Sequence, residues 1–407
     1  MAMAGDRGLN DGAVAGTRIV VIAPRLYPDA VGGIEVFNYR LLRWLETRPG
    51  ASPRAVTISR GEGLRPESVV SAGSGRLGAR LARFYLFLGR ELRAARRTRA
   101  VALVSYARGR WWHWPMVSAL LRFSGIAYVV YIHGGGLTIP RPRSVGRSLL
   151  GGGSRVLAVS TRQARFYEEE FGLEAEVLPP VMPFAESKLS RAEARCAFGL
   201  PHSAVILLSV GSLKPIKGTD VLISAFGHVL AGAEVPSAVH LVLAGAGDVA
   251  QYEQRAAAAN LGGSVTFLGH VPNERIPDLY RACDGFVLAS RLEGQPIALL
   301  EAAFNRMPCI VTALPGLDPE WHDERSCLIV PVGDPRSLAV ALRRMVEDDT
   351  LRDVLGRNAR DVYDRLYAGT DAFERLWHAF QDAATKSAGG SGRRTSTDQA
   401  VVQSTRP

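Results

Sequence analysis

Lysine and cysteine are scarce in this sequence. Only four residues are lysine, at positions 188, 214, 217 and 386, whereas lysine and arginine together number 49. The basic positions are therefore almost all arginine, and two of the four lysines fall in one short turn. The four cysteines form no CxxC pair and lie in or near apolar runs, which favours buried free thiols over a metal site or a disulfide framework.

Long apolar runs and leader-like segments are also missing. No stretch approaches the ~18 consecutive apolar residues that a membrane-spanning helix needs. The first 17 residues contain glycine and aspartate and lack a basic region followed by an apolar one. We therefore expect no membrane span, no signal peptide and a cytoplasmic location.

Length and charge indicate two unlike halves. A chain of 407 residues exceeds what one hydrophobic core normally organises, and 47% of its residues are apolar, so two domains are expected. Residues 1–185 contain 26 arginines against 13 acidic residues, whereas the remainder contains 23 basic and 26 acidic residues. The basic half is expected to face something anionic.

Short apolar runs followed by glycine-bearing turns and helical patterns occur in both halves. This order predicts an α/β protein with two Rossmann-like parallel-sheet domains, whose glycine turns face each other across a cleft. We expect a flexible N-terminus (1–17), a first domain (18–183), a second domain (184–383) closed by a helical region, and a disordered tail (384–407). The expected strands are 19–23, 101–105, 126–132 and 156–159, then 205–210, 239–244, 265–268, 286–289 and 309–312.

Two glycine segments of the first half follow expected strands. Gly32 and Gly33 precede a helical pattern, and paired glycines there either let backbone amides approach a phosphate or sugar or form a tight turn. Both interpretations stay open. His133 follows the strand at 126–132 and precedes three glycines. A histidine with no side-chain bulk beside it is poorly explained as core, so we expect it to contact a ligand.

Arginine and tryptophan mark two further segments. Residues 76–99 form a helical pattern with interleaved arginines, which is either an ordinary helix with a solvated basic face or a face for anionic lipid headgroups or a phosphorylated substrate. No nucleic-acid-binding motif accompanies this charge, so we expect no nucleic acid partner. The aromatic residues at 111–114 either stack on a sugar ring beyond a strand end or pack under a loop.

The stretch from Glu293 to Glu301 lies between two apolar strands and starts a helix, with Pro296 near its first turn. At the helical rise the two carboxylates are separated by roughly 12 Å, which suits a long ligand held at two points. A dipole contact for one glutamate and a solvent-facing position for the other is the competing explanation. Spacing alone does not decide between them.

The turn from Gly211 to Gly218 carries Lys214 and Lys217 directly after an expected strand. A lysine there can neutralise a diphosphate as a compact charge. The segment 245–250 matches a dinucleotide fingerprint but lacks a carboxylate at the end of the next strand, so we reject an NAD-dependent enzyme. Lysines for phosphates and glutamates for hydroxyls indicate a nucleoside diphosphate-sugar.

The second half resembles glycosyltransferase family 4, a family of retaining enzymes with the GT-B architecture. The first half is similar in its glycine loop at 28–35, in His133-Gly134 and in Val159-Ser160, so that the resemblance covers roughly residues 18–380. The matching segments of the second half are Val210-Gly-Ser-Leu-Lys-Pro-Ile-Lys-Gly-Thr-Asp220, Leu243-Ala-Gly-Ala-Gly-Asp248, Val265-Thr-Phe-Leu-Gly269 and Ser290-Arg-Leu-Glu-Gly294 continuing to Glu301.

This resemblance implies transfer of a sugar from a nucleoside diphosphate-sugar (UDP-, GDP- or another) to a carbohydrate, lipid-linked or small-molecule acceptor, with no bound cofactor or metal. Glu301 would hold the donor ribose, Glu293 and the amides after it the sugar, Lys217 the leaving diphosphate, and His133 the sugar near the reacting carbon. Cationic groups then take the electrostatic role of a metal. The implied catalytic residues are His133, Glu293 and Lys217, and the implied donor-binding residues are Gly32, Gly33, Gly211, Ser212, Lys214, Gly294, Gln295, Pro296, Ile297 and Glu301.

The sequence departs from the family pattern at two points. Ser212 stands where the family often has a second phosphate-clamping arginine, for which Lys214 is the candidate replacement. Arg306-Met307 replaces a common Cys-Gly and alters only the helix end. A catalytically silent nucleotide-sugar-binding protein is the alternative to a transferase that builds a polysaccharide, glycolipid or metabolite. The arginines at 76–99 add the anionic inner face of a membrane as a candidate partner.

Overall fold

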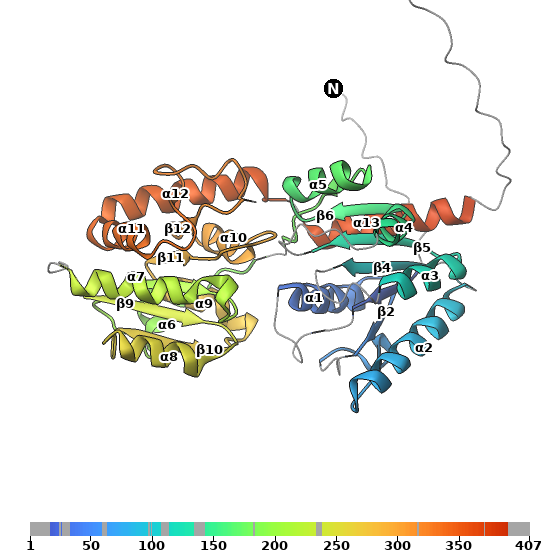
Figure 1. Cartoon of the computed structure of the whole chain (residues 1–407), viewed down its shortest axis with the longest axis horizontal. Coiled ribbons are helices and arrows are strands. Elements are labelled where there is room, and N and C mark those ends of the chain that lie inside the picture. Colours follow the sequence, from blue (N-terminus) through green and yellow to red (C-terminus); the bar gives the residue numbers. More distant parts are fainter. Residues whose placement is uncertain are drawn as a thin grey trace, which may run out of the picture.

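The computed structural model describes residues 17–23, 26, 33–58, 63–96, 98, 100–106, 114–133, 143–181, 184–232, 238–315, 317–369 and 371–389. These residues form two α/β lobes that lie side by side along the long axis of the molecule (Figure 1). The N-terminal lobe is built on one parallel sheet and the C-terminal lobe on a second. No helix in the described part combines the length and the apolar character needed to cross a bilayer.

The N-terminal lobe is a parallel sheet with helices on both faces, and its described strands follow the order β3-β2-β1-β4-β5-β6-β7. In β1, Ile19 and Val21 pack with α1 and α13, whereas Val20 and Ile22 pack with α2 and α3. Burial on both faces explains why these strands read as continuous apolar runs. The elements are β1 (Thr17–Ile22), α1 (Gly33–Thr47), β2 (Ala51–Thr57), β3 (Val69–Ser71), α2 (Leu77–Ala95), β4 (Ala100–Tyr106), α3 (Trp114–Ser124), β5 (Ala127–Ile132), α4 (Arg143–Gly151), β6 (Arg155–Ala158), α5 (Thr161–Phe171), β7 (Glu176–Val177) and α13 (Ala372–Gly389).

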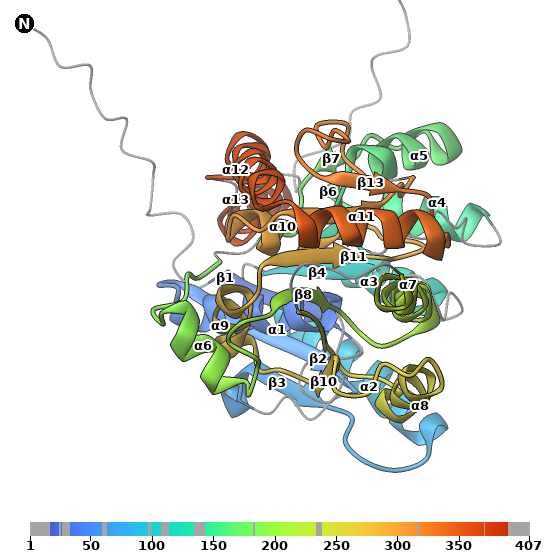
Figure 2. The ribbon, with the colours of Figure 1, turned by 90° about the vertical axis from the view of Figure 1, so that its left-hand side faces the viewer.

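The C-terminal lobe repeats this plan with the strand order β10-β9-β8-β11-β12-β13 in its described part. Its sheet has α7, α8 and α11 on one face and α6, α9, α10 and α12 on the other (Figure 2). The elements are α6 (Arg191–Ala197), β8 (Val205–Val210), the 3-10 turn η4 (Pro215–Lys217), α7 (Thr219–Ala231), β9 (Val239–Ala244), α8 (Val249–Ala258), β10 (Val265–Gly269), α9 (Ile276–Ala282), β11 (Gly285–Leu288), α10 (Ile297–Phe304), β12 (Cys309–Thr312), β13 (Leu328–Val330), α11 (Pro335–Glu347) and α12 (Asp349–Leu366).

The two parallel α/β sheets expected from the sequence are confirmed. Each expected strand is present, with ends shifted by at most two residues, and the structure adds β2, β3, β7 and β13. In both sheets every strand pair is parallel, so the carboxyl ends of the strands lie at one edge of each sheet.

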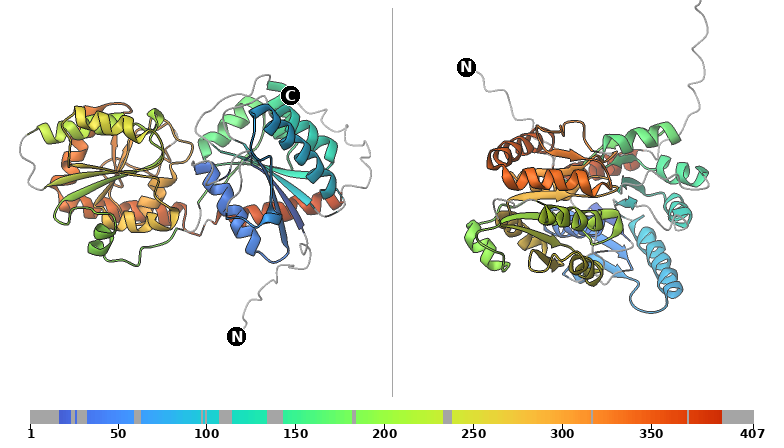
Figure 3. Two further views of the ribbon diagram at one scale, coloured as in Figure 1. Left: turned by 90° about the horizontal axis from the view of Figure 1, so that it is seen from below. Right: turned by 60° about the vertical axis from the view of Figure 1, so that its left-hand side comes forward.

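The last helix corrects the expected division of the chain. We expected residues 184–383 to form one domain, but α13 crosses back and packs on the sheet of the N-terminal lobe (Figure 3). Its apolar stripe, Phe373, Leu376, Trp377 and Phe380, has helical spacing and fills the core beneath β4 and β5. The helix also continues to Gly389, so residues 384–389 are helical rather than part of a tail, and residues 390–407 lie outside the described part.

Candidate active site

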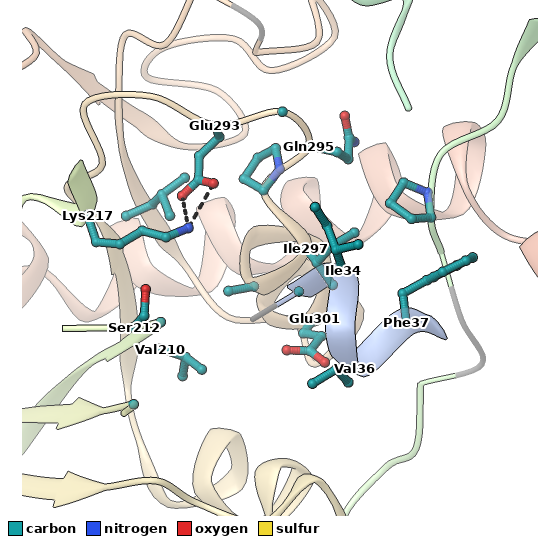
Figure 4. Close-up of a pocket in the computed structure, with 18 of the residues that line it drawn as sticks. Ile34, Val36, Phe37, Val210, Ser212, Lys217, Glu293, Gln295, Ile297 and Glu301 are labelled. Carbon is teal, nitrogen blue, oxygen red and sulfur yellow. Dashed lines mark hydrogen bonds and ion pairs between the residues drawn. The ribbon is translucent and has the colours of Figure 1, made fainter. Parts of the chain in front are cut away.

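A cavity of about 520 Å³ lies between the lobes, and we call it the cleft cavity. The N-terminal lobe contributes the first turns of α1 and the residue that follows β5. The C-terminal lobe contributes the turns after β8, β9 and β10 and the start of α10 (Figure 4). Because these segments follow the carboxyl ends of parallel strands, the cavity occupies the position where α/β sheets bind ligands.

Lys217 and Glu293 meet in the cleft cavity although 76 residues separate them. Lys217 Nζ donates to both carboxylate oxygens of Glu293, at 2.7 and 2.9 Å, and Ser290 Oγ donates to Glu293 Oε1 at 2.6 Å. The Glu293 side chain is only 12% exposed, so the lysine compensates a largely buried charge. The arrangement places a cation and a carboxylate at the same point of the cavity wall (Figure 4).

A second ion pair fixes the two loops that carry these residues. Arg291 donates to both carboxylate oxygens of Asp220 at 2.8 Å each, a bidentate contact between the β11–α10 loop and the start of α7. The backbone N–H of Arg291 also donates to the carbonyl of Ile216 at 2.8 Å. At Gly218, φ is 69° and a Cβ would collide with the carbonyl of Ala289, so only glycine permits this approach.

Glycines also bring the turns after β8 and β9 together. A Cβ on Gly245 would collide with the carbonyl of Gly211, and a Cβ on Gly247 would collide with the carbonyl of Leu213. The backbone N–H of Gly211 donates to the carbonyl of Ala244 at 2.9 Å. These glycines are therefore explained by packing of one loop on another, which agrees with rejecting a dinucleotide fingerprint there.

Glu293 precedes α10 rather than lying inside it. The helix begins at Ile297, so the helical rise does not apply between Glu293 and Glu301, and the expected separation of roughly 12 Å has no basis in the structure. Pro296 is the residue before the helix, and Gln295 Nε2 donates to the hydroxyl of Tyr367 at 3.1 Å. The Ile297 amide donates to the carbonyl of Gln295 at 3.0 Å, so this amide is already engaged within the turn.

Glu301 lies one turn into α10 and lines the same cavity (Figure 4). Tyr280 Oη lies 3.4 Å from Glu301 Oε2 and 3.0 Å from the carbonyl oxygen of Ala298. Burial raises the pKa of Glu301 to about 7, against the opposing effects of the Arg40 charge and of the Tyr280 hydrogen bond. Near neutral pH this carboxyl is therefore poised between its two protonation states.

His133 follows β5 at the opposite wall of the cavity and is 5% exposed. Its ring packs on Tyr131 and Phe37, with centroids 4.1 and 5.3 Å away. Its buried Nε2 has no hydrogen-bond partner among the described residues, and burial lowers the pKa of the imidazole to about 3. His133 is thus a neutral ring with an unsatisfied nitrogen, which a ligand hydroxyl could satisfy.

The structure brings most of the expected site residues together. Those that line the cleft cavity are Gly33, His133, Gly211, Ser212, Lys217, Glu293, Gly294, Gln295, Pro296, Ile297 and Glu301. Lys214 does not line it: this residue precedes η4 and is exposed, so the expected replacement for a clamp at Ser212 lies outside the cavity wall. Gly32 and the aromatic loop at 111–113 lie outside the described residues.

Several lining residues were not expected from the sequence. Arg40 reaches the cavity from α1, and His270, Asn273 and Ile276 reach it from the segment after β10. Arg40 is one arginine among 26 in its half, so composition gave no signal for it. Its spacing from Val36 and Phe37, which line the same cavity, is the helical pattern that could have selected it.

Two family models match the chain, one for each lobe. Residues 190–362 match the model described as glycosyl transferases group 1, and residues 31–182 match the model described as glycosyltransferase family 4.

Curated relatives carry glycosyltransferase and synthase names. A D-inositol 3-phosphate glycosyltransferase of Geodermatophilus obscurus is 30% identical over 272 residues, which span 62% of this chain and 58% of that protein. A mannosylfructose-phosphate synthase of Agrobacterium fabrum is 28% identical over 235 residues, or 54% of this chain and 51% of that protein. The chain thus matches little more than half the length of these relatives.

Solved structures share the whole fold. Sucrose-phosphate synthase from Thermosynechococcus elongatus superposes with a TM-score of 0.73 at 20% identity, covering 91% of this chain and 100% of that one. Anabaena HepE in complex with UDP-glucose gives a TM-score of 0.68 at 16% identity, covering 91% and 99%. The solved structures show that the chain has the GT-B fold. Because the two glycosyltransferase models together cover residues 31–182 and 190–362, the chain belongs to glycosyltransferase family 4.

Proposed function

We propose that this protein transfers a sugar from a nucleoside diphosphate-sugar to an acceptor hydroxyl with retention of the anomeric configuration. The observation that carries the proposal is the convergence of Lys217, Glu293 and Glu301 on one cavity between two lobes. One cation suits a diphosphate, and two carboxylates suit the hydroxyls of a ribose and of a hexose. The C-terminal lobe is then the donor side and the N-terminal lobe the acceptor side.

Each side chain has a distinct task in this proposal. Glu301 accepts hydrogen bonds from the ribose hydroxyls, and Glu293 accepts from the hydroxyls of the transferred sugar. Lys217, which contacts Glu293 in the structure, turns toward the diphosphate, whose negative charge competes for the ammonium group. His133 offers its neutral, unsatisfied Nε2 to a sugar hydroxyl near the reacting carbon.

The chemical step breaks the bond between the anomeric carbon and the diphosphate oxygen. A bond from the acceptor oxygen forms on the same face of the sugar, and the acceptor proton passes to the departing phosphate oxygen. Charge accumulates on the leaving diphosphate, where Lys217 and the amide of Gly294 stabilise it. These cationic and dipolar groups carry out the charge stabilisation for which other transferases use a metal ion.

The relatives narrow the proposed substrates. The UDP-glucose complex of Anabaena HepE supports a uridine donor, with a guanosine donor as the second candidate. The names of the curated relatives support a small phosphorylated polyol or sugar as acceptor, and a lipid-linked or polysaccharide acceptor is the alternative. A phosphorylated polyol or sugar as acceptor fits a cytoplasmic enzyme, and a lipid-linked acceptor fits an enzyme at the inner face of a membrane.

Nucleotide release from a panel of sugar nucleotides tests the transferase. Lys217→Ala is expected to lower turnover by about 100-fold or more, because it removes a group that stabilises the transition-state charge. Lys188→Ala, an exposed lysine outside the cleft cavity, is the matched control and should retain wild-type turnover. Saturable donor binding without turnover on any acceptor preparation contradicts the enzyme and favours a silent binding protein.

We also propose that the N-terminal lobe rests on an anionic membrane surface through α2 and α3. These helices pack together and expose Leu77, Leu86, Met116 and Phe123, the last being 79% exposed. Arg90, Arg93 and Arg122 are exposed on the same two helices. Apolar side chains beside cations suit the interface of an anionic bilayer.

Flotation with vesicles tests this surface. Wild-type protein should float with vesicles rich in phosphatidylglycerol and not with neutral ones, and Phe123→Ser with Leu86→Ser should abolish flotation. Val340→Ser, at an exposed apolar residue of α11 in the C-terminal lobe, is the control. Equal recovery with neutral and anionic vesicles would remove the basis for the membrane proposal.

A further inference from the structure

A second cavity of about 330 Å³ adjoins the cleft cavity, and we call it the side cavity. It shares Arg40, Asn273, Ile276 and Glu301 with the cleft cavity, so the two spaces meet at these four residues. The far part of the side cavity is lined by aromatic side chains of both lobes, namely Trp44, Phe184, Tyr280 and Phe373. The junction therefore lies between the proposed donor cavity and an aromatic recess.

The proposed orientation of the donor places the nucleobase at this junction. Lys217 and Glu293 mark the diphosphate and sugar end, and Glu301 marks the ribose. A base attached to that ribose lies beyond Glu301, away from Lys217, where Asn273, Ile276 and Arg40 line both cavities. At this point α1 of the N-terminal lobe supplies the cationic wall.

We propose that Arg40 is a donor-specificity residue: from the N-terminal lobe, its guanidinium recognises a base that presents a carbonyl oxygen, such as uracil or guanine. The inference builds on the proposed sugar transfer and adds the base class. Arginine carries only donors, in a planar fork that pairs with carbonyl acceptors or stacks on a ring. Adenine presents an amino group where guanine has its carbonyl, so Arg40 disfavours an adenosine donor.

The charge of Arg40 also acts on Glu301 across the cleft, against the effect of burial. Removing Arg40 therefore favours the protonated carboxyl, in which one oxygen becomes a donor, so that the group is a weaker acceptor of ribose hydrogen bonds. The ionisable groups around α10 include Tyr280 on α9, Cys309 on β12, and Arg360 and Tyr363 on α12. Those that line the two cavities are Arg40, His133, Lys217, His270, Glu274, Tyr280, Glu293 and Glu301.

Calorimetric titration of UDP, GDP, ADP and inorganic diphosphate into the full chain tests the proposal. Arg40→Met keeps the apolar stem and is expected to weaken the preferred keto nucleotide by about 10-fold or more. ADP should lose clearly less, because it shares only the effect through Glu301 and the ribose, and diphosphate should lose less than about 3-fold. Arg43 lies three residues further along α1, is exposed and lines neither cavity, so Arg43→Met is the control and should bind all four probes like wild type. Equal losses for all four probes, or no loss, overturn the role in base recognition.

A pH series separates electrostatic action from a merely structural role. With Arg40→Met, the loss of affinity on acidification should move to higher pH, whereas Arg43→Met should leave it in place. An unshifted profile together with unchanged base preference refutes the inference. If wild-type protein binds none of the three nucleotides, the proposed sugar transfer fails instead, so the two failures are distinguishable.

Discussion

Replacing Glu301 by glutamine tests whether the cleft carries a charge at the expense of stability. Burial raises the pKa of Glu301 from 4.5 to about 7 in the folded protein. Below about pH 4.5 the group is protonated in the folded and unfolded chain alike. Its contribution to stability is therefore fully present there and is lost as the pH rises through about 7, because folding then requires an ionised carboxylate in the cleft.

The size of this loss follows from the shift. At 1.36 kcal/mol per pKa unit, the loss is at most about 3 kcal/mol, and less where cleft water reaches the carboxylate. Glutamine keeps the shape and carries no charge. The free energy of unfolding of Glu301→Gln, relative to wild type, should thus be higher at pH 8 than at pH 5.

Urea unfolding of wild type and Glu301→Gln at both pH values measures this difference. Glu274→Gln, at an exposed carboxylate of the side cavity, is the control and should show no comparable change with pH. Donor affinity should respond in the opposite sense, since ionised Glu301 accepts the ribose hydroxyls: wild-type affinity falls below pH 7, and Glu301→Gln binds weakly throughout. A stability difference that is equal at pH 5 and pH 8 would refute the reasoning.

Three further changes probe the supports of the site. Arg291→Ala removes the bidentate pair with Asp220 and should lower kcat/KM for the donor by about 10-fold, with a stability change near 1 kcal/mol by urea unfolding; an unchanged kcat/KM contradicts the bracing role. Gly218→Ala places a Cβ against the Ala289 carbonyl at positive φ and should cost about 2 kcal/mol or more by the same measurement, whereas the exposed Gly262→Ala should not. Trp377→Ala should lower the free energy of unfolding by about 3 kcal/mol and speed amide exchange in β4 and β5. Faster exchange confined to the C-terminal lobe would contradict this prediction.

Much of the fold could be predicted because buried parallel strands have a plain sequence signature. The runs at 127–132 and 205–210 are apolar apart from Ser209 and are followed by histidine and glycine, so their positions were close to those observed. The strand β2 was missed because Pro53 and Arg54 interrupt its apolar character. The strands β3 and β7 are too short to carry a pattern.

The site could be predicted in part for a related reason. Turns that follow parallel strands converge at one sheet edge, so Lys217, Glu293 and His133 were expected together. The direction of a side chain within a turn is a different matter: Lys214 and Lys217 share one turn, yet only Lys217 lines the cavity. Local sequence carries no information about that direction, because it is set by the loop after β11 packing on the turn.

Arg40 was the hardest site residue to predict, because it reaches the cavity from the opposite lobe and its position depends on how the two lobes are connected. The described chain passes between the lobes near Val181 and again near Ala372, and the N–H of Ala372 donates to the carbonyl of Val181 at 3.1 Å. Since both crossings share one point, a relative motion of the lobes would be a rotation about it. Such rotation leaves Lys217 and Glu293 together, because both belong to the C-terminal lobe, but it changes the separation between Arg40 and Glu301. In the proposed site, the contacts within the C-terminal lobe therefore persist at any angle between the lobes, whereas the contact of Arg40 with the base depends on that angle.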